Sequence, residues 1–164
     1  MSDVSDPDSL LLGEFRRKLD DRFRLLVPSD WIQSISPGGE HCILTKERPG
    51  CLSLWNSTQW QKRLDEGMAL VHSKIRAGKL SEKLADVQLL GRLLSTRHKL
   101  IPVAERGRIV LPDGFREFLG LEPGSEVMVL GAAICIEIWH PEQWIDHLGE
   151  QMPGFGSLFD KLTG

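Results

Sequence analysis

The stretch Arg22-Phe23-Arg24-Leu25-Leu26-Val27-Pro28 returns later in the chain as Arg106-Gly107-Arg108-Ile109-Val110-Leu111-Pro112, with 108 − 24 = 84 residues between equivalent positions. The same offset pairs further residues of the two segments: Cys51 with Cys135, Trp55 with Trp139, Gln59 with Gln143, Trp60 with Trp144 and Leu64 with Leu148. One register over this length indicates an internal duplication, in which one structural unit is used twice. Two related copies predict a surface with pseudo-twofold symmetry, on which each copy presents its arginines.

The bulk properties are those of a soluble, cytoplasmic protein. With 164 residues the chain can bury a core, as one domain or as two small fused ones. It has no run of about 18 uncharged apolar residues, so we expect no membrane span. The acidic start Met1–Asp8 does not resemble a signal peptide. An odd number of cysteines without a CxxC pair suits a reducing compartment, and Cys51 and Cys135 are expected to be buried strand residues.

The positive charge is concentrated in two places although the net charge is −3. Residues 14–24 contain five Lys or Arg against three acids, and residues 97–108 contain four against Glu105 alone. Both clusters fall at the start of a repeat. The net charge argues against a protein that coats nucleic acid generally, whereas the clusters allow local binding of phosphates.

The two segments show the same order of expected elements. In the first segment, strands are predicted over 15–19, 24–27, 41–45 and 51–55, with a polar turn at Asp20-Asp21 and a turn over 46–50. A short helix is predicted that is capped by Ser29 or Asp30 and ended by residues 37–39, and a longer helix begins at Ser57. In the second, strands are predicted over 100–103, 109–111, 127–130 and 134–139, with a short helix ended by Gly120, a turn over 122–124 and a helix opened by Pro141. Residues 81–95 predict the second helix of a connecting hairpin.

The resulting division is a disordered leader (1–10), a first repeat with a connecting helix (11–80), a second repeat preceded by a connecting helix (81–149) and a tail (150–164). The tail segment 152–156 is expected to be loop-like. Its apolar residues Phe155, Leu158, Phe159 and Leu162 are predicted either to dock on a neighbour or to fray.

The repeated arginines are the best candidates for function. A turn between two strands is a rigid platform, and the planar guanidinium matches phosphates or guanine edges with two hydrogen bonds. The alternative is that Arg22, Arg24, Arg106 and Arg108 only pair with the neighbouring acids Asp20, Asp21 and Glu105. Their recurrence in both copies favours binding.

Other chemistry has less support in the sequence. Trp55, Trp139, Trp60 and Trp144 are expected to be core residues rather than base-stacking platforms, as are Trp31 and Phe115. His140 and His147 have no partner at ligand spacing, so we expect no metal site. The sequence has no paired nucleophile and base, carboxylate pair or phosphate loop, so we expect no enzyme, no cofactor and no small-molecule substrate.

These motifs, taken together, resemble the MraZ family. In the first half the resemblance is carried by Gly13-Glu14, by Asp20-x-Arg22-x-Arg24-Leu25-Leu26-Val27-Pro28 and by Cys51-Leu52-x-Leu54-Trp55 with Trp60. In the second half it is carried by residues 107–112, Phe115-Arg116, Leu119-Gly120-Leu121 and Glu137-Ile138-Trp139 before Trp144. It covers roughly residues 12–149.

The resemblance implies an α+β fold of two tandem swapped-hairpin, AbrB-like β-barrel repeats with connecting and flanking helices. It also implies a cytoplasmic, nucleoid-associated transcriptional regulator that forms ring-shaped homo-oligomers and binds short direct repeats in double-stranded DNA upstream of the division and cell-wall gene cluster. The family signature is a DxxxR motif in each half, complete here as Asp20 and Arg24. In the second half Arg108 remains, but Ala104 replaces the acid.

The predicted DNA-binding residues follow from this signature. Arg24 and then Arg108 are the leading candidates, with Asp20 orienting Arg24. Contacts to phosphate are predicted for Arg22, Arg106, Arg16, Lys18 and Lys99. The alternative is a divergent copy that keeps fold and assembly but acts through protein partners. Phe23, where the family has Gly, and Ala104 favour it.

Overall fold

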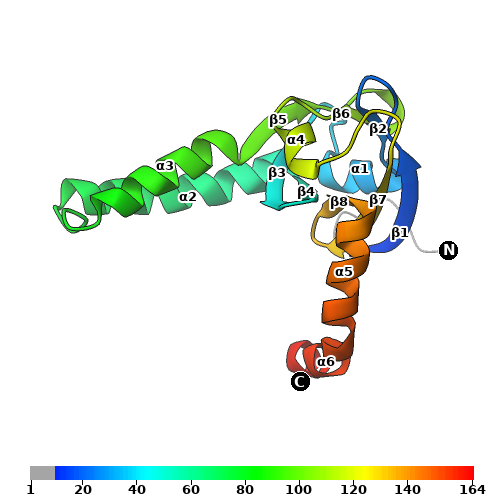
Figure 1. Ribbon diagram of the computed structural model, residues 1–164. Coiled ribbons are helices and arrows are strands. Elements are labelled where there is room, and N and C mark those ends of the chain that lie inside the picture. Colours follow the sequence, from blue (N-terminus) through cyan, green and yellow to red (C-terminus); the bar gives the residue numbers. More distant parts are fainter. Residues whose placement is uncertain (1–9) are drawn as a thin grey trace.

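In the computed structural model, which describes residues 10–164, eight strands form two antiparallel sheets (Figure 1). The larger sheet has the order β1-β7-β8-β4-β3-β5, and the smaller one pairs β2 with β6. The strands are β1 (Leu11–Lys18), β2 (Arg24–Leu26), β3 (His41–Arg48), β4 (Cys51–Trp55), β5 (His98–Pro102), β6 (Arg108–Val110), β7 (Glu126–Ala133) and β8 (Ile136–Trp139). The predicted α+β class is confirmed. Apart from Leu10, the predicted leader lies outside the described residues.

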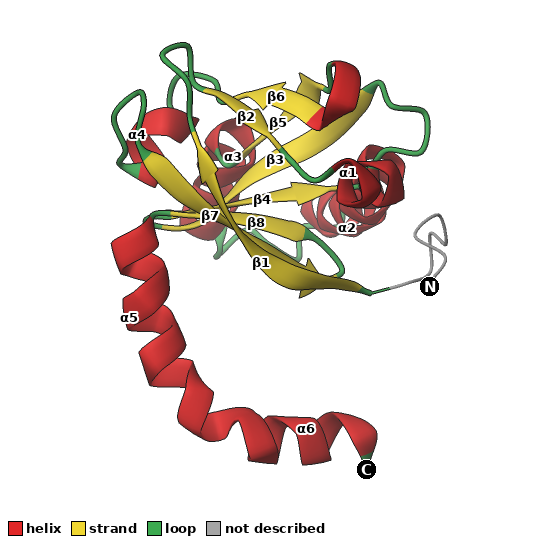
Figure 2. Ribbon diagram, turned by 90° about the vertical axis from the view of Figure 1, so that its right-hand side faces the viewer, coloured by secondary structure: helices red, strands yellow, loops and turns green. Residues whose placement is uncertain are grey.

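The helices form two arms and two short caps. The α2–α3 hairpin extends from one side of the sheets, and α5 with α6 descends from another (Figures 1 and 2). The helices are α1 (Ser29–Ile35), α2 (Ser57–Arg76), α3 (Leu84–Thr96), α4 (Phe115–Leu119), α5 (Pro141–Gln151) and α6 (Phe155–Thr163), with 3-10 turns η1 (Glu105–Gly107) and η2 (Met152–Gly154). Among residues 10–164, no helix combines the length and the apolar character needed to cross a bilayer.

Strand pairing connects the two halves of the chain throughout. β4 pairs with β8 and β2 pairs with β6, so equivalent strands of the two halves lie side by side. The first strand of each half pairs with the third strand of the other half, as β1 with β7 and β5 with β3. If each strand of the large sheet is replaced by its equivalent in the other half (β1 by β5, β3 by β7, β4 by β8, and the reverse), the strand order is the same when read from the opposite edge.

The core lies between the two sheets and the short helices. Leu25 of β2 and Ile109 of β6 are almost completely buried, and they pack into the cluster that contains the inward residues of the large sheet. Trp31 and Phe115 join this core, as predicted. Cys42, Cys51 and Cys135 are buried free thiols. The expectation of a buried strand residue is confirmed for Cys51 in β4, whereas Cys135 is buried but lies in the bend between β7 and β8.

Long-range contacts correct several predicted boundaries. The turn expected over 46–50 shrinks to Pro49-Gly50, because Lys46 and Arg48 pair with Leu52 and Cys51 of β4; the N–H of Lys46 also donates to the carbonyl of Arg97 at 2.8 Å. Strand β8 begins at Ile136, two residues later than predicted, and β1 begins at Leu11, four residues earlier.

Three further predictions about local structure were wrong. Helix α1 is preceded by Pro28 and receives no side-chain cap from Ser29 or Asp30. The tail segment 152–156 is not a loop, because η2 and the start of α6 occupy it. Among the tryptophans, Trp139 is buried, but Trp55, Trp60 and Trp144 are only half-buried.

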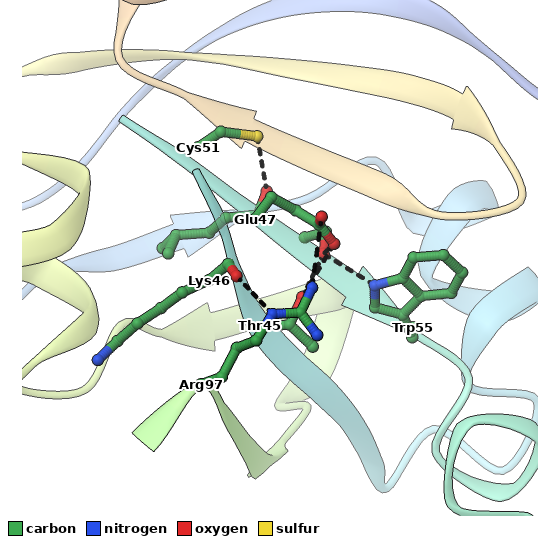
Figure 3. Close-up of polar contacts among 8 residues, drawn as sticks. Thr45, Lys46, Glu47, Cys51, Trp55 and Arg97 are labelled. Carbon is green, nitrogen blue, oxygen red and sulfur yellow. Dashed lines mark hydrogen bonds and ion pairs between the residues drawn. The ribbon is translucent and has the colours of Figure 1, made fainter. Parts of the chain in front are cut away.

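A polar network fixes the base of the α2–α3 hairpin to the sheet (Figure 3). Arg97 lies between α3 and β5; its Nε donates to the carbonyl of Lys46 at 3.1 Å, and it forms a 3.6 Å ion pair with Glu47. Another Glu47 oxygen accepts from the Ser53 hydroxyl at 2.6 Å, and that hydroxyl accepts from the Trp55 indole at 2.8 Å. The residue that ends the helical arm is therefore held by the β3–β4 hairpin.

Candidate nucleic-acid interface

Strands β2 and β6 form a short two-stranded ribbon with one buried and one exposed face. In the register, Arg24 lies opposite Val110, Leu25 opposite Ile109, and Leu26 opposite Arg108. Side chains of residues directly opposite each other share a face. Because Leu25 and Ile109 face the core, the other two pairs form the outer face of the ribbon. The β2–β6 ribbon lies at the end of the molecule opposite α5 and α6 (Figures 1 and 2).

The outer face carries two arginines at diagonal corners. Between them lie Leu26 and Val110, which are 46% and 45% exposed. Because every second residue of a strand shares a face, Leu26 and Val110 could have been placed on the faces of Arg24 and Arg108 from the sequence. They add an apolar contact surface between the charged groups.

The first turn orients Arg24 through the carboxylate of Asp20. The Oδ1 atom accepts from the backbone N–H groups of Arg22 at 2.9 Å and Arg24 at 2.8 Å, and Oδ2 accepts from the Arg24 guanidinium at 2.5 Å. Donation from the backbone of Arg24, with smaller contributions from its side chain and from Arg22, lowers the pKa of Asp20. The carboxylate therefore stays ionised and holds both the turn and the guanidinium.

Phe23 adopts the backbone conformation that a glycine normally provides. Its φ of 57° lies in the left-handed region, as does the φ of 80° at the equivalent Gly107. The ring packs against the core, and the Arg116 guanidinium stacks over it at 4.4 Å. Replacement of glycine at this position therefore leaves the left-handed turn in place.

The second turn closes with the same pair of backbone hydrogen bonds but lacks the orienting acid. The N–H of Ala104 donates to Arg108, and that of Gly107 donates to Ala104, as the equivalent groups do in the first turn. Here, however, Arg106 also has a positive φ, of 64°. Within residues 10–164, no side-chain hydrogen bond or ion pair involves Arg108, so its direction is not fixed.

The structure brings four of the predicted residues together and separates three others. Arg22 and Arg106 are exposed in the two turns, next to the ribbon that carries Arg24 and Arg108. The remaining three lie on the two outer strands of the large sheet: Arg16 and Lys18 on β1, and Lys99 on β5. Arg16 forms a 3.0 Å ion pair with Glu126, whereas Lys18 and Lys99 are exposed.

The described residues offer little support for metal chemistry. Within residues 10–164, no group of three or more His, Cys, Asp or Glu side chains is arranged to hold a metal ion. His147 instead stacks on Trp139, with ring centroids 4.9 Å apart.

Comparisons with known proteins agree with the resemblance seen in the sequence. The model of the family described as "MraZ protein, putative antitoxin-like" matches residues 103–155. Several relatives bear the name "Transcriptional regulator MraZ". That of Heliobacterium modesticaldum is 29% identical over 153 residues, which is 93% of this chain and 96% of the relative. Those of Syntrophomonas wolfei and Acetivibrio thermocellus are 28% and 26% identical, each covering 94% of this chain and 97% of the relative.

Proposed function

Because this chain belongs to the MraZ family, we propose that it is a transcriptional regulator that binds double-stranded DNA sequence-specifically. The observation that carries this proposal is the outer face of the β2–β6 ribbon, with Arg24 and Arg108 at its corners. The protein acts in the cytoplasm, associated with the nucleoid, and is not an enzyme. Its targets are short direct repeats upstream of the division and cell-wall gene cluster.

The ribbon has the dimensions and side chains for reading a DNA groove. The major groove admits a two-stranded β-ribbon, and an arginine can make two hydrogen bonds to the O6 and N7 atoms of guanine. Arg24 is the primary reader, because Asp20 fixes its guanidinium before DNA arrives. Arg108 reads second, and Leu26 and Val110 supply apolar contacts such as those made to a thymine methyl group.

The other basic residues contribute affinity rather than sequence preference. Arg22 and Arg106 flank the ribbon and contact phosphates, while Lys18 and Lys99 extend the positive field along the outer strands. Arg16 makes a smaller contribution, because Glu126 already neutralises it.

The fold that presents these residues is a tandem pair of swapped-hairpin, AbrB-like repeats. The unchanged strand order on exchange of the two halves supports this description. The chain further assembles into a ring-shaped homo-oligomer. A ring places many ribbons along an arc, so binding of one DNA repeat raises the effective concentration of the next ribbon.

A divergent copy without DNA binding is the competing function, and Ala104 is the observation that favours it. Arg108 lacks the carboxylate that orients Arg24 in the first half. Phe23 no longer favours this alternative, because it adopts the left-handed conformation that the turn requires.

The proposal is tested by fluorescence anisotropy with a duplex from upstream of the protein's own gene and a scrambled duplex. Arg24→Ala is expected to weaken specific binding by about 1–3 kcal/mol. Arg24→Lys is also expected to weaken it, because lysine keeps the charge but lacks the planar guanidinium that Asp20 holds in place. Arg92→Ala, on α3, removes the same residue type from a surface away from the ribbon and is expected to leave the preference for the specific over the scrambled duplex unchanged.

Salt dependence provides the second readout. Each phosphate contact is expected to contribute roughly −0.9 to the slope of log K against log salt. Equal binding of both duplexes by wild type and Arg24→Ala, with no dependence on salt, would favour the competing function.

A further inference from the structure

Two helical arms of this chain expose apolar surface that nothing within residues 10–164 covers. Helices α2, α3, α5 and α6 contain no buried residue. The α2–α3 hairpin, here called the hairpin arm, and α5–η2–α6, here called the C-terminal arm, leave the sheets in different directions (Figures 1 and 2). Because the arms diverge, they do not cover each other within one chain.

The C-terminal arm ends in a strongly amphipathic helix. Phe155, Leu158, Phe159 and Leu162 follow the spacing of a single helix face and are 54% to 74% exposed. The rings of Phe155 and Phe159 contact each other with centroids 5.8 Å apart. A nine-residue helix is marginal in water without a packing partner, so this face is expected to need one.

The hairpin arm offers a matching hollow. A shallow groove of about 470 Å³ runs along α2 and is lined by Asp65, Met68, Ala69, Val71, His72 and Ile75. Its floor is mostly apolar and contains the adaptable side chain of Met68. Leu89 and Leu93, one turn apart on α3, add further exposed apolar surface to the arm.

The two arms carry opposite charge. The hairpin arm, residues 57–96, has seven Lys or Arg against four Asp or Glu, a net charge of +3. The C-terminal arm, residues 141–164, has four acids against Lys161, a net charge of −3. Among the residues that the structure describes, none of these side chains is engaged in an ion pair within the chain.

The acids of α5 form a stripe that is unfavourable in isolation. Glu142, Asp146 and Glu150 are spaced four residues apart, and like charges at this spacing destabilise a helix. Around the hairpin tip lie the basic residues Lys74, Arg76, Lys79 and Lys83. A basic partner surface would relieve the repulsion along α5.

We propose that the C-terminal arm of one copy docks on the hairpin arm of a second copy, with the apolar face of α6 in the groove along α2. The contact joins two different surfaces, so a pair of copies keeps one free hairpin arm and one free C-terminal arm, and the contact repeats until a ring closes. The inference rests on the ring assembly of the proposed function, but it does not require the chain to bind DNA.

Charge exchange between two variants of the full chain tests this contact. The first variant, Asp146→Lys/Glu150→Lys/Asp160→Lys, changes the C-terminal arm from −3 to +3. The second, Lys74→Glu/Lys79→Glu/Lys83→Glu, changes the hairpin arm from +3 to −3. In either variant alone both arms carry charge of the same sign and repel each other. In a mixture, the C-terminal arm of each variant can dock on the oppositely charged hairpin arm of the other variant.

Analytical ultracentrifugation gives the readout. Wild type is expected to sediment as a multiple of the 18.5 kDa chain, each variant as a smaller species, and the equimolar mixture as an assembly again. The control Glu14→Lys/Glu40→Lys/Glu122→Lys makes the same change in total charge as the first variant, but at exposed sites outside the arms. It is expected to assemble like wild type. Circular dichroism confirms that the variants fold.

Several outcomes would overturn the proposal: a wild type that stays a single chain, single variants that assemble like wild type, or a mixture that does not assemble. Phe155→Ala/Phe159→Ala supplies an uncharged check and is expected to raise the concentration for half-assembly at least tenfold. Binding of DNA by the separated variants is measured alongside. Loss of assembly with retained weak binding supports the arm contact, whereas intact assembly without specific DNA binding rejects only the DNA-binding proposal.

Discussion

Gly107 holds the second turn against the ribbon, and replacing it with alanine tests how tightly the two turns pack. Its φ of 80° is left-handed, and a Cβ atom there would lie 2.8 Å from the carbonyl oxygen of Val27 and 3.2 Å from Cγ2 of Ile32. The left-handed conformation costs a residue with a side chain roughly 1–2 kcal/mol. Relief of the close contact moves the Val27 backbone, whose N–H donates to Gly107 at 3.1 Å, and losing that hydrogen bond costs about 1 kcal/mol.

We therefore expect Gly107→Ala to lower the free energy of unfolding by about 2–3 kcal/mol. The matched control is Gly124→Ala, because Gly124 has a φ of 83° but nothing within 4 Å of the added Cβ atom. This control is expected to cost only the backbone term of about 1–2 kcal/mol. Urea unfolding followed by tryptophan fluorescence, at one protein concentration, measures both. Equal losses in the two variants would show that the contact between Gly107 and Val27 has no energetic weight.

Three further predictions concern the ribbon and the buried thiols. Ile109→Ala removes a fully buried ribbon residue and is expected to lower the free energy of unfolding in urea by about 2–5 kcal/mol. Val110→Ala, on the outer face, should change it by less than about 0.5 kcal/mol. Similar losses in the two variants would contradict the assignment of the faces. Because the folded-state pKa of Asp20 is lowered, its contribution to stability is present above the unfolded-state pKa and is lost as the pH falls through the folded value. The Arg24 amide signal in NMR should therefore change only below the ordinary carboxyl range, and an earlier change would contradict this. Burial raises the pKa of Cys42 and Cys135 to about 12 and raises the pKa of Cys51 as well. A chromogenic disulfide reagent at pH 8 should therefore modify none of the three thiols until denaturant is added. Rapid reaction of the native protein would disprove this prediction.

Local pattern in the sequence was sufficient to predict most elements and their repetition. The strand predicted over 51–55 matches β4 to the residue, and Gly120 correctly predicted the end of α4. Failures occurred where distant segments decide. Strand β1 begins four residues earlier than predicted because Leu11, Leu12 and Gly13 pair with Ala133, Ala132 and Gly131 of β7. The partner of β1 is thus a strand of the other half, which no local pattern indicates.

The two arginine-bearing turns, and the missing acid at Ala104, could be predicted from the sequence, but the conformation of the first turn could not. Repetition of the arginine motif identified the two turns, and the ribbon brings their arginines together. The sequence could not predict that Phe23 would adopt a left-handed conformation, because this depends on packing of its ring beneath Arg116. Nor could charge counting distinguish Arg97, which forms an ion pair with Glu47, from the other basic residues of the same cluster.

The exchange of strands between the two halves has a consequence for synthesis of the chain on the ribosome. Lys18 pairs with Glu126, so β1 leaves the ribosome 126 − 18 = 108 residues before its partner exists. At about 5–20 residues per second this interval is roughly 5–22 s, during which the first half has an unpaired strand and an incomplete core. Folding of the sheet must therefore follow translation of the second half, and a nascent chain stalled before β7 would expose the surface of β1 to other proteins.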